Sequence, residues 1–438
     1  MSKDEREIPT GRFSRFARLS ALSTQVTASV LTQKARSVFQ KDEDRLKGLL
    51  TSQIRNAERI VDTMGNLKGA VMKIGQMFSL HDGEGVSPEV AAILARLQNQ
   101  APRIPWSRVR EQFITSFGKG PEDLFQSFDT EPVAAASLGQ VYRAVLPDGT
   151  PVAVKVQYPG IRDTLSSDLR NLRSMLEAMG VVSSRMDTRH IFAEIEALHK
   201  EEADYLNEAI NLEEFRHLFR DDPRVVIPRY FPPFSSETVL TMEWLDGQGL
   251  SQALEQGLSE DDANALGLLT FDIFMKQLLV FGTLHADPHH GNFLVLPGGR
   301  IGLLDFGCVK RFPPGFLEGY RALTRATLRR NRAEMIPLLV DIGFLINDQN
   351  PRANDLLCEI TEVALLPFKE DQEFDFGKAD LHGRLRDLPK RMMGIGKVSF
   401  PPDALYLNRV FMGEYFLLRR LKARANWHSM VMAHLGQI

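Results

Sequence analysis

Two neighbouring segments decide the fold: His285 to Asn292 (HADPHHGN) and Leu303 to Gly307 (LLDFG). An Asp-Phe-Gly sequence alone is common by chance, but here one predicted strand-turn-strand joins it to the upstream segment. The amide oxygen of Asn292 and the carboxylate of Asp305 are hard oxygen ligands of the kind that Mg2+ prefers. Three histidines nearby could indicate Zn2+ instead, but they lack a compact helical or cysteine-paired pattern. We therefore predict a magnesium site.

The spacing from Asp287 to Asn292 matches the catalytic loop of protein kinases. In that template the aspartate positions or deprotonates the attacking group, while Asn292 and Asp305 would hold magnesium against nucleotide phosphates. The sequence also contains Val-Ala-Val-Lys ending at Lys155, which matches the strand lysine of kinases. Because an unpaired buried ammonium group is costly, Lys155 is expected to bind phosphate oxygens and a glutamate.

Four acidic residues, Glu201, Glu202, Asp204 and Glu208, are predicted to lie on one helix. Asp204 and Glu208 are four positions apart and would share a face, whereas Glu202 would point about 120° away from Glu208. One direction is expected to pair with Lys155 and the other with a different cation. The alternative is an ordinary solvated acidic helix.

The glycine-rich loop that kinases place before the strand lysine is missing. The equivalent stretch is Ala134-Ala135-Ala136-Ser137, and alanine does not freely adopt the positive φ angles that glycine allows. These four residues, with Lys155, Met242 and Leu245, are the predicted nucleotide contacts. Since the phosphates would be covered differently, transfer of the γ-phosphate to a large substrate is not expected.

The N-terminal part carries two further patterns. Residues 1–44 include a basic amphipathic stretch without Asp or Glu from Ile8 to Gln40, which is typical of a membrane-surface helix, a targeting peptide or a helix packed on the protein. Residues 45–125 are predicted to be helical, and Gly65, Gly69, Lys73 and Gln76 share one face there. Two glycines on one helix face suggest close approach of a backbone or ligand, or simply a solvated face.

The bulk properties narrow the class of protein. The chain has 438 residues, a net charge of −3 and two cysteines, so neither nucleic-acid binding nor a disulfide framework is expected. The most apolar stretch, Gly267 to Leu284, contains charged residues and is expected to be a buried helix, so no membrane-spanning helix is predicted. We expect a cytoplasmic or matrix-side protein, at most peripherally bound to a membrane.

Together these residues resemble the UbiB family of atypical kinases, which is linked to ubiquinone (coenzyme Q) biosynthesis. Lys73-Ile74-Gly75-Gln76 resembles the family's Lys-x-Gly-Gln motif, Ala134 to Ser137 its alanine-rich loop, and Glu202-Ala203-Asp204 its Glu-x-Asp motif. The resemblance implies that Glu208 pairs with Lys155. It also implies that Lys73 and Gln76 reach into the active site and meet Glu202 and Asp204 as regulatory residues.

The resemblance implies an α+β, two-lobed protein-kinase-like fold with an N-terminal helical extension. Residues 126–246 would form the N-lobe with a helical insertion, and residues 247–438 a mainly helical C-lobe. The implied cofactors are ATP or ADP and Mg2+. The expected partners are adenine nucleotide, membrane lipid or quinone precursors, and quinone-biosynthesis proteins.

The leading functional hypothesis is an atypical kinase-like ATPase, or small-molecule kinase, that supports ubiquinone or related lipid metabolism. In this hypothesis Asp287, Lys155 and Glu208 are the catalytic residues, and Asn292 and Asp305 bind the metal. The alternative is a nucleotide-gated, lipid-binding or complex-organising switch without productive turnover. A protein kinase that phosphorylates other proteins is the least expected reading, because the glycine loop is missing and no Ser or Thr lies between Gly307 and Thr324.

Overall fold

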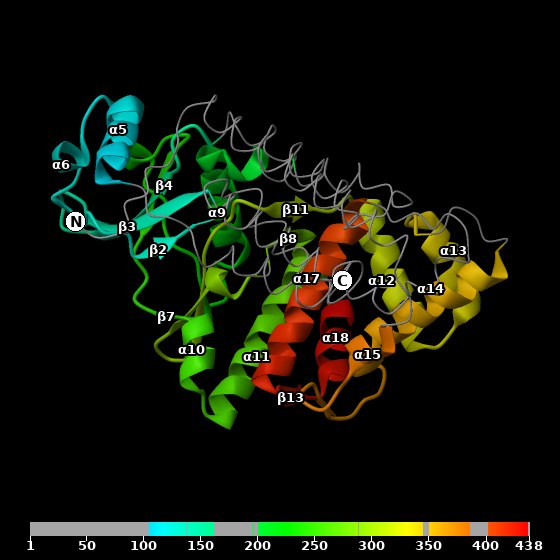
Figure 1. Ribbon diagram of the computed structural model, residues 1–438. Helices are drawn as coiled ribbons and strands as arrows, with labels where there is room; N and C mark the ends of the chain where they lie inside the picture. The colour runs from blue at the N-terminus through cyan, green and yellow to red at the C-terminus, as the bar shows by residue number, and fades with distance from the viewer. Residues whose placement is uncertain are drawn as a thin grey trace, which may run out of the picture. The chain divides into compact units, whose positions relative to one another are not determined.

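The computed structural model describes residues 105–136, 138–161, 196, 200–287, 289–344, 350–385 and 402–436. These residues form two compact units (Figure 1). Unit 1 holds the described residues up to Ile210 together with Arg229–Trp244, and unit 2 holds Asn211–Pro228 and the chain from Leu245 onward. The predicted segment 1–44, most of segment 45–125, and Lys73, Gln76 and Ser137 lie outside the described residues.

Unit 1 is built on an antiparallel sheet with the order β1-β3-β4-β6, and β2 also pairs with β3. Two helices precede the sheet, and helix α9 begins in this unit and continues into unit 2. The elements are α5 (Trp106–Phe117), α6 (Pro121–Leu124), β1 (Ser127–Phe128), β2 (Ala134–Ala135), β3 (Gly139–Val145), β4 (Pro151–Gln157), α9 (Tyr205–Leu218), η1 (Pro232–Phe234) and β6 (Val239–Glu243).

The predicted hairpin around Lys155 is confirmed. Strands β3 and β4 pair in antiparallel register, with Val141 opposite Lys155. Gly149 adopts φ 87°, and the Asp148 carboxylate accepts a hydrogen bond of 2.9 Å from the backbone N–H of Thr150, as a tight turn requires. Apolar side chains of the sheet pack against the aromatic residues of α5 and β1. This packing holds the strand that carries Lys155.

Unit 2 contains the strands that carry the two deciding segments. A four-stranded sheet has the order β5-β10-β9-β7, and β8 pairs with β11. The strands are β5 (Val225–Val226), β7 (Gln248–Gly249), β8 (Thr283–His285), β9 (Phe293–Leu296), β10 (Arg300–Leu303), β11 (Val309–Arg311), β12 (Phe374–Asp375) and β13 (Arg424–Ala425). The predicted strand-turn-strand is therefore confirmed as β9 and β10. Most of the other strands have only two or three residues, too few to show a period in the sequence.

Helices make up the rest of unit 2, and α11, α17 and α18 lie alongside one another (Figure 1). The helices are α10 (Leu250–Gln256), α11 (Glu260–Met275), α12 (Pro314–Leu328), α13 (Arg332–Asp341), α14 (Pro351–Ala364), α15 (Leu381–Leu385), α17 (Pro402–Leu421) and α18 (Trp427–Gly436), with short helical turns η3 (His290–Asn292) and η4 (Leu366–Phe368). A π-helical turn, η2 (Lys276–Phe281), extends α11. The described part of the chain is thus α+β, as predicted.

Helix α11 explains the most apolar stretch of the sequence. Its N-terminus is capped by Ser259, whose hydroxyl accepts a 3.1 Å hydrogen bond from the backbone N–H of Asp262. Within the described residues one helical run, Glu260–Phe281, is long and apolar enough to cross a membrane, and 61% of its most apolar window is buried inside the protein. Because its buried side chains pack on α17 and α18, it serves as a core helix of unit 2.

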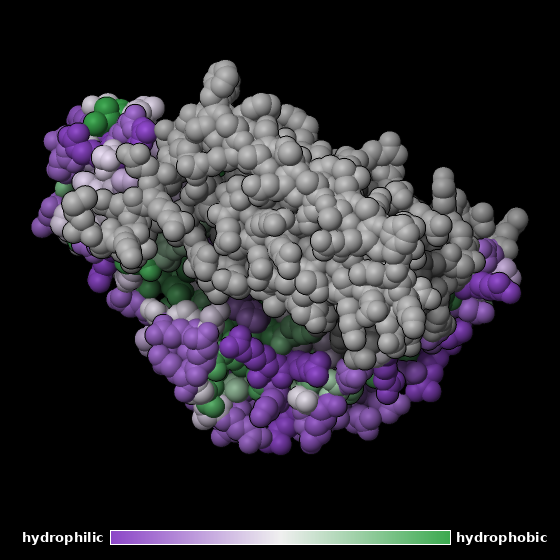
Figure 2. Space-filling view, viewed as in Figure 1, coloured by the Kyte–Doolittle hydropathy of each residue, from purple (hydrophilic) through white to green (hydrophobic). Residues whose placement is uncertain are grey.

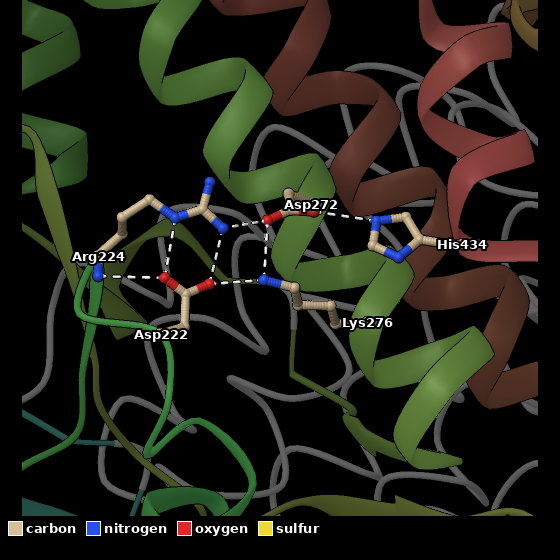
Figure 3. Close-up of polar contacts among 5 residues, drawn as sticks. All are labelled: Asp222, Arg224, Asp272, Lys276 and His434. Atoms are coloured by element: carbon tan, nitrogen blue, oxygen red, sulfur yellow. Dashed lines mark hydrogen bonds and ion pairs between the residues drawn. The ribbon is translucent and has the colours of Figure 1, made fainter. Parts of the chain in front are cut away.

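A network of charged residues joins three parts of unit 2 (Figure 3). Asp222 accepts hydrogen bonds from Arg224 at 2.7 and 2.8 Å and from Lys276 at 2.6 Å, and Asp272 accepts one from His434 at 2.9 Å. Arg224 also contacts Asp272. The hydrogen bonds from Arg224 hold the pKa of Asp222 well below its usual range. The network therefore ties the loop before β5 to α11 and α18.

The described surface visible in Figure 2 is mostly polar. Large exposed apolar side chains in the described ranges are few and scattered, at Ile114, Val133, Leu206, Ile210, Val280 and Met432. Isolated apolar residues of this kind are ordinary for a folded surface.

Candidate functional site

Lys155 and Glu208 form a buried ion pair in unit 1. The Lys155 Nζ atom lies 2.9 Å from both carboxylate oxygens of Glu208, and the two side chains are 5% and 1% exposed. The Lys155 ammonium also lies 5.1 Å from the ring centroid of Tyr205. Strand β4 and helix α9 position the pair. The two short hydrogen bonds offset part of the cost of burying the pair and fix the direction of the lysine side chain.

The acidic residues do not lie on one continuous helix, so this prediction was wrong. The helical turn ends at Glu202, and α9 begins only at Tyr205. The Asp204 side chain accepts hydrogen bonds from the backbone N–H groups of Leu206 at 3.1 Å and Asn207 at 3.4 Å. Aspartate is a preferred N-cap residue for this reason, and its charge favours the positive end of the helix. Asp204 therefore caps the start of the helix that carries Glu208.

The break before α9 also positions Glu202. The Gln157 side-chain amide on β4 donates a 3.0 Å hydrogen bond to the carbonyl of Ala203, which holds the turn against the sheet. Glu202 is 5% exposed, an unusual burial for a carboxyl group. A solvated acidic helix is therefore excluded for Glu202 and Glu208.

The alanine loop is part of the sheet. Ala134 and Ala135 form β2 and pair with Val141 and Gln140 of β3, and Ala136 and Gly139 exchange backbone hydrogen bonds of 3.0 and 3.4 Å. None of the three alanines has a positive φ. The segment thus replaces a flexible glycine loop with a short extended hairpin.

The remaining predicted nucleotide contacts fall in different places. Met242 lies on β6, opposite Ala153 of β4, and is 6% exposed. Leu245 is half-buried at the start of the second stretch of unit 2. There its side chain lies near the backbone of Gly302 on β10.

Asp287 and Asn292 are joined directly in unit 2. The Asn292 side-chain amide donates hydrogen bonds of 3.0 Å to Asp287 Oδ2 and 3.2 Å to its backbone carbonyl. The 3-10 turn η3 makes this contact possible, because His289 caps it with a 3.0 Å hydrogen bond from the Gly291 N–H. Since the amide nitrogen is committed to Asp287, the Asn292 carbonyl oxygen is the atom left to face a cation.

Asp305 has a strained backbone. Its φ is 58°, in the left-handed region that non-glycine residues rarely adopt. One carboxylate oxygen accepts a 3.3 Å hydrogen bond from the Gly307 N–H. The next residue, Phe306, is fully buried against Phe215, and its carbonyl accepts a 2.9 Å hydrogen bond from Asn211. The contacts of Phe306 and Gly307 therefore hold Asp305 in its strained conformation, and strain of this kind clusters at functional sites.

Arg409 is a site residue that sequence reasoning missed. From helix α17 its Nη2 atom donates a 2.7 Å hydrogen bond to Asp287 Oδ1, and the two side chains are 9% and 14% exposed. Its Nε and Nη1 atoms are buried and have no hydrogen-bond partner among the described residues. The sequence signal was an arginine beside the apolar positions of an amphipathic helix, which is a weak one.

Among the three histidines of the first segment, His290 is favoured in its neutral form. Burial, together with the charges of His289 and Arg420, lowers the pKa of His290 to about 4. The His285 ring donates from Nε2 to the carbonyl of Leu304 at 3.1 Å, in the tautomer that this bond requires. Within the described ranges no three His, Cys, Asp or Glu side chains gather as metal ligands.

The donor set fits magnesium bound together with phosphate. Asn292 and Asp305 offer one amide oxygen and one carboxylate, too few to enclose a cation. Mg2+ usually keeps several waters and binds one or two protein carboxylates plus substrate phosphates. Because the amide nitrogen of Asn292 is hydrogen-bonded to Asp287, its amide oxygen is the atom available to bind Mg2+.

Comparisons with known proteins show the family of the chain. Residues 96–339 match the ABC1 atypical kinase-like domain. The chain is 30% identical over 436 residues to the atypical kinase COQ8B, mitochondrial, of Danio rerio, covering 98% of the chain and 69% of the relative. It is 29% identical to the atypical kinase COQ8, mitochondrial, of Saccharomyces cerevisiae, covering 95% and 83%.

A solved structure extends the agreement to the fold. The complex of Rv3197 with erythromycin from Mycobacterium tuberculosis matches with a TM-score of 0.59 at 25% identity, over 89% of this chain and 97% of that one. The predicted α+β kinase-like fold and the resemblance to the UbiB and COQ8 proteins are thereby confirmed. The chain belongs to the ABC1 atypical kinase-like family, which includes the COQ8 proteins.

Proposed function

We propose that this protein is a magnesium-dependent ATPase, or small-molecule kinase, that supports ubiquinone or related lipid metabolism. The observation that carries the proposal is the group formed by Asp287, Asn292 and Arg409. It holds a carboxylate by two directed hydrogen bonds beside an amide oxygen free for a cation. Phosphoryl transfer needs both groups: a carboxylate that positions the attacking group and an oxygen ligand for the metal ion.

The residues then take separate roles. Asp287 orients the attacking water or hydroxyl group and accepts its proton. Lys155, kept charged and oriented by Glu208, binds phosphate oxygens. Asn292 and Asp305 hold Mg2+, which when bound neutralises charge on the phosphates and orients them. Ala134 to Ser137, Met242 and Leu245 contact the nucleotide, which is ATP or ADP.

Protein substrates are not part of the proposal. The alanine loop is a paired hairpin, and the segment after Asp305 is held as β11 against β8. Arg311 of β11 contacts Glu214 and donates a 2.7 Å hydrogen bond to Asn211, both on α9. A segment anchored in this way does not need phosphorylation to order it. Lys73 and Gln76 are proposed to regulate the site together with Glu202 and Asp204.

The cellular context is proposed from the relatives. Two of the matched atypical kinases carry the word mitochondrial in their names. We propose a matrix-side or cytoplasmic protein that binds a membrane peripherally and acts on or near quinone precursors, with quinone-biosynthesis proteins as partners. The N-terminal amphipathic stretch is the proposed membrane contact.

The test measures magnesium-dependent ATP turnover by the full chain, with and without liposomes and phenolic quinone precursors. Asp287→Asn should lower turnover by about 10²–10⁴-fold and leave Mg-nucleotide binding by thermal shift intact. Asp305→Asn should lose the magnesium-dependent part of that shift. Asp355→Asn, at a carboxylate 77% exposed, is the matched control.

Two outcomes would change the conclusion. Wild-type protein without magnesium-dependent turnover under any of these conditions would remove the ATPase proposal. If Asp287→Asn binds nucleotide, fails to hydrolyse it and still supports quinone production in cells, a nucleotide-gated switch would replace it.

A further inference from the structure

Glu414 is a buried carboxyl group that the proposed function does not use. It lies on α17 in the apolar stripe that also contains Leu407, Val410, Leu417 and Leu421, all of them buried. Glu414 itself is only 8% exposed. Its Oε1 atom is buried and has no hydrogen-bond partner in the described part of the chain. A carboxyl group at a core position of an amphipathic helix is rare and calls for a reason.

The charged form of Glu414 is disfavoured. An unpaired carboxylate in an apolar interior loses its hydration without compensation, so the group keeps its proton instead. Burial raises the pKa of Glu414 to about 7, and the nearby Thr270 hydroxyl offsets only part of that rise. At and below neutral pH Glu414 therefore carries an O–H group that can donate a hydrogen bond.

That donor faces the same small cavity as Asp287. The cavity measures about 30 Å3 and lies among α11, η2, β8, β9, β10 and α17, all within unit 2. Its polar lining consists of Glu414, Asp287, Thr270, Gln277 and His285. Most of the other lining side chains are apolar. A cavity of this volume has room for one water molecule, which needs two to four polar partners such as these five residues.

Two other polar side chains of the cavity, Gln277 and Thr270, already form hydrogen bonds that fix their orientation. Gln277 accepts a 2.7 Å hydrogen bond from the His285 N–H through its amide oxygen, which leaves its amide nitrogen as a donor. The Thr270 hydroxyl donates to the Gly267 carbonyl at 3.1 Å. The π-helical turn η2 brings Gln277 to β8, as such turns often do at functional sites.

We propose that protonated Glu414 positions Asp287 through a water molecule held in this cavity. The Glu414 O–H donates to the water, and the water donates to the Asp287 carboxylate, which already accepts hydrogen bonds from Arg409 and Asn292. The role rests on the proposed function, because Asp287 is the residue that would orient the attacking group. Glu414 is a positioning residue and does not contact substrate.

Ionisation of Glu414 would weaken the arrangement. A second negative charge would then face Asp287 across the water, in a medium that screens poorly. Besides Glu414, the titratable groups that line the cavity are His285 on β8 and Asp287, which follows β8. Arg409, on the same helix as Glu414, is the cation that contacts Asp287. Helix α11 and strands β9 and β10 contribute Thr270 and apolar side chains only. The positioning is therefore expected to fail as pH rises through the Glu414 titration.

The experiment compares Glu414→Gln, Glu414→Leu and, as a control, Glu255→Gln at an exposed position of α10. Glutamine keeps the size and remains a hydrogen-bond donor at every pH, whereas leucine removes the donor. The kcat for Mg-ATP should fall in the wild type as pH rises through about 7. In Glu414→Gln that fall should vanish, with kcat within about twofold of the wild-type value at low pH. Glu414→Leu should lose about tenfold in kcat, the worth of one hydrogen bond, with KM for ATP unchanged.

A second readout does not depend on turnover. Hydrogen exchange of the peptide spanning Ala286 to Asn292 should be faster in Glu414→Leu than in the wild type and unchanged in Glu414→Gln. If Glu414→Gln keeps the wild-type pH profile, the positioning role is overturned while the ATPase proposal stands. If the wild type shows no turnover, the ATPase proposal fails and exchange alone decides: equal exchange in all variants overturns the positioning role.

Discussion

Two buried glutamates, one in each unit, differ in how their carboxyl groups are stabilised: one is paired with a lysine, and the other is favoured in its protonated form. Glu208 of unit 1 is 1% exposed and has Lys155 Nζ at 2.9 Å from both oxygens. Glu414 of unit 2 is 8% exposed, and one of its oxygens has no partner among the described residues. The first residue stays charged because a cation is buried with it, whereas the second is driven toward its neutral form.

The two glutamates therefore differ in function: Glu208 holds a lysine in place, whereas Glu414 can change its protonation state with pH. The two 2.9 Å hydrogen bonds from Lys155 to Glu208 hold the lysine side chain in one direction. A lone buried carboxyl titrates near neutral pH, so Glu414 can change state under working conditions. Three predictions test this contrast.

The largest expected effect is on the pair in unit 1. Lys155→Met should lower the free energy of unfolding by about 3–5 kcal/mol, because it removes the cation that is buried against the Glu208 carboxylate. Lys155→Met combined with Glu208→Leu should recover most of that loss, since no charge then remains in the interior. Denaturant unfolding of the three proteins checks this. If Lys155→Met is as stable as the wild type, the Lys155–Glu208 pair does not contribute to the free energy of unfolding.

The next effect is the pH dependence of stability at Glu414. Its folded-state pKa, about 7, lies above the ordinary value of 4.5, so its contribution is fully present below about 4.5 and lost as pH rises to about 7. The loss amounts to roughly 3 kcal/mol, and Glu414→Gln should not show it. Unfolding free energies of both proteins across that window give the test. A constant difference between them would mean that Glu414 does not titrate there.

The smallest effect is expected at Arg409. Arg409→Met removes the 2.7 Å contact to Asp287, but it also removes two buried nitrogens that have no hydrogen-bond partner among the described residues. The cost to the free energy of unfolding should therefore be only about 1–2 kcal/mol, well below that of Lys155→Met. The same denaturant titration measures both variants. If Arg409→Met costs as much as Lys155→Met, the two ion pairs would contribute equally to the free energy of unfolding.

Local patterns predicted much of the fold and the chemistry. The strand ending at Lys155, the turn before it and the strands β9 and β10 follow from alternation of apolar residues and turn chemistry, which act over a few residues. Asp287, Asn292 and Asp305 were identified by spacing alone, and two of them are in contact. Such motifs are readable because their residues are close in the chain.

The wrong prediction and the residues that were not identified have a common cause. A continuous acidic helix was predicted from composition, but the Asp204 side chain competes for backbone N–H groups and begins a new helix. Arg409 and Glu414 were not identified, although both lie at or beside the buried face of α17. Their importance depends on contact with residues more than 120 positions earlier in the chain, which no local pattern encodes.

By itself, the sequence determined which groups could hold a magnesium-bound nucleotide, because those residue types at those spacings are required by the chemistry. Only the tertiary structure decided which of the buried charges are paired and which are not. Lys155 with Glu208, Arg409 with Asp287, and Glu414 beside a small polar cavity are outcomes of packing distant segments together. The physical reason is that burial sets the cost of a charge, and burial is a property of the folded chain.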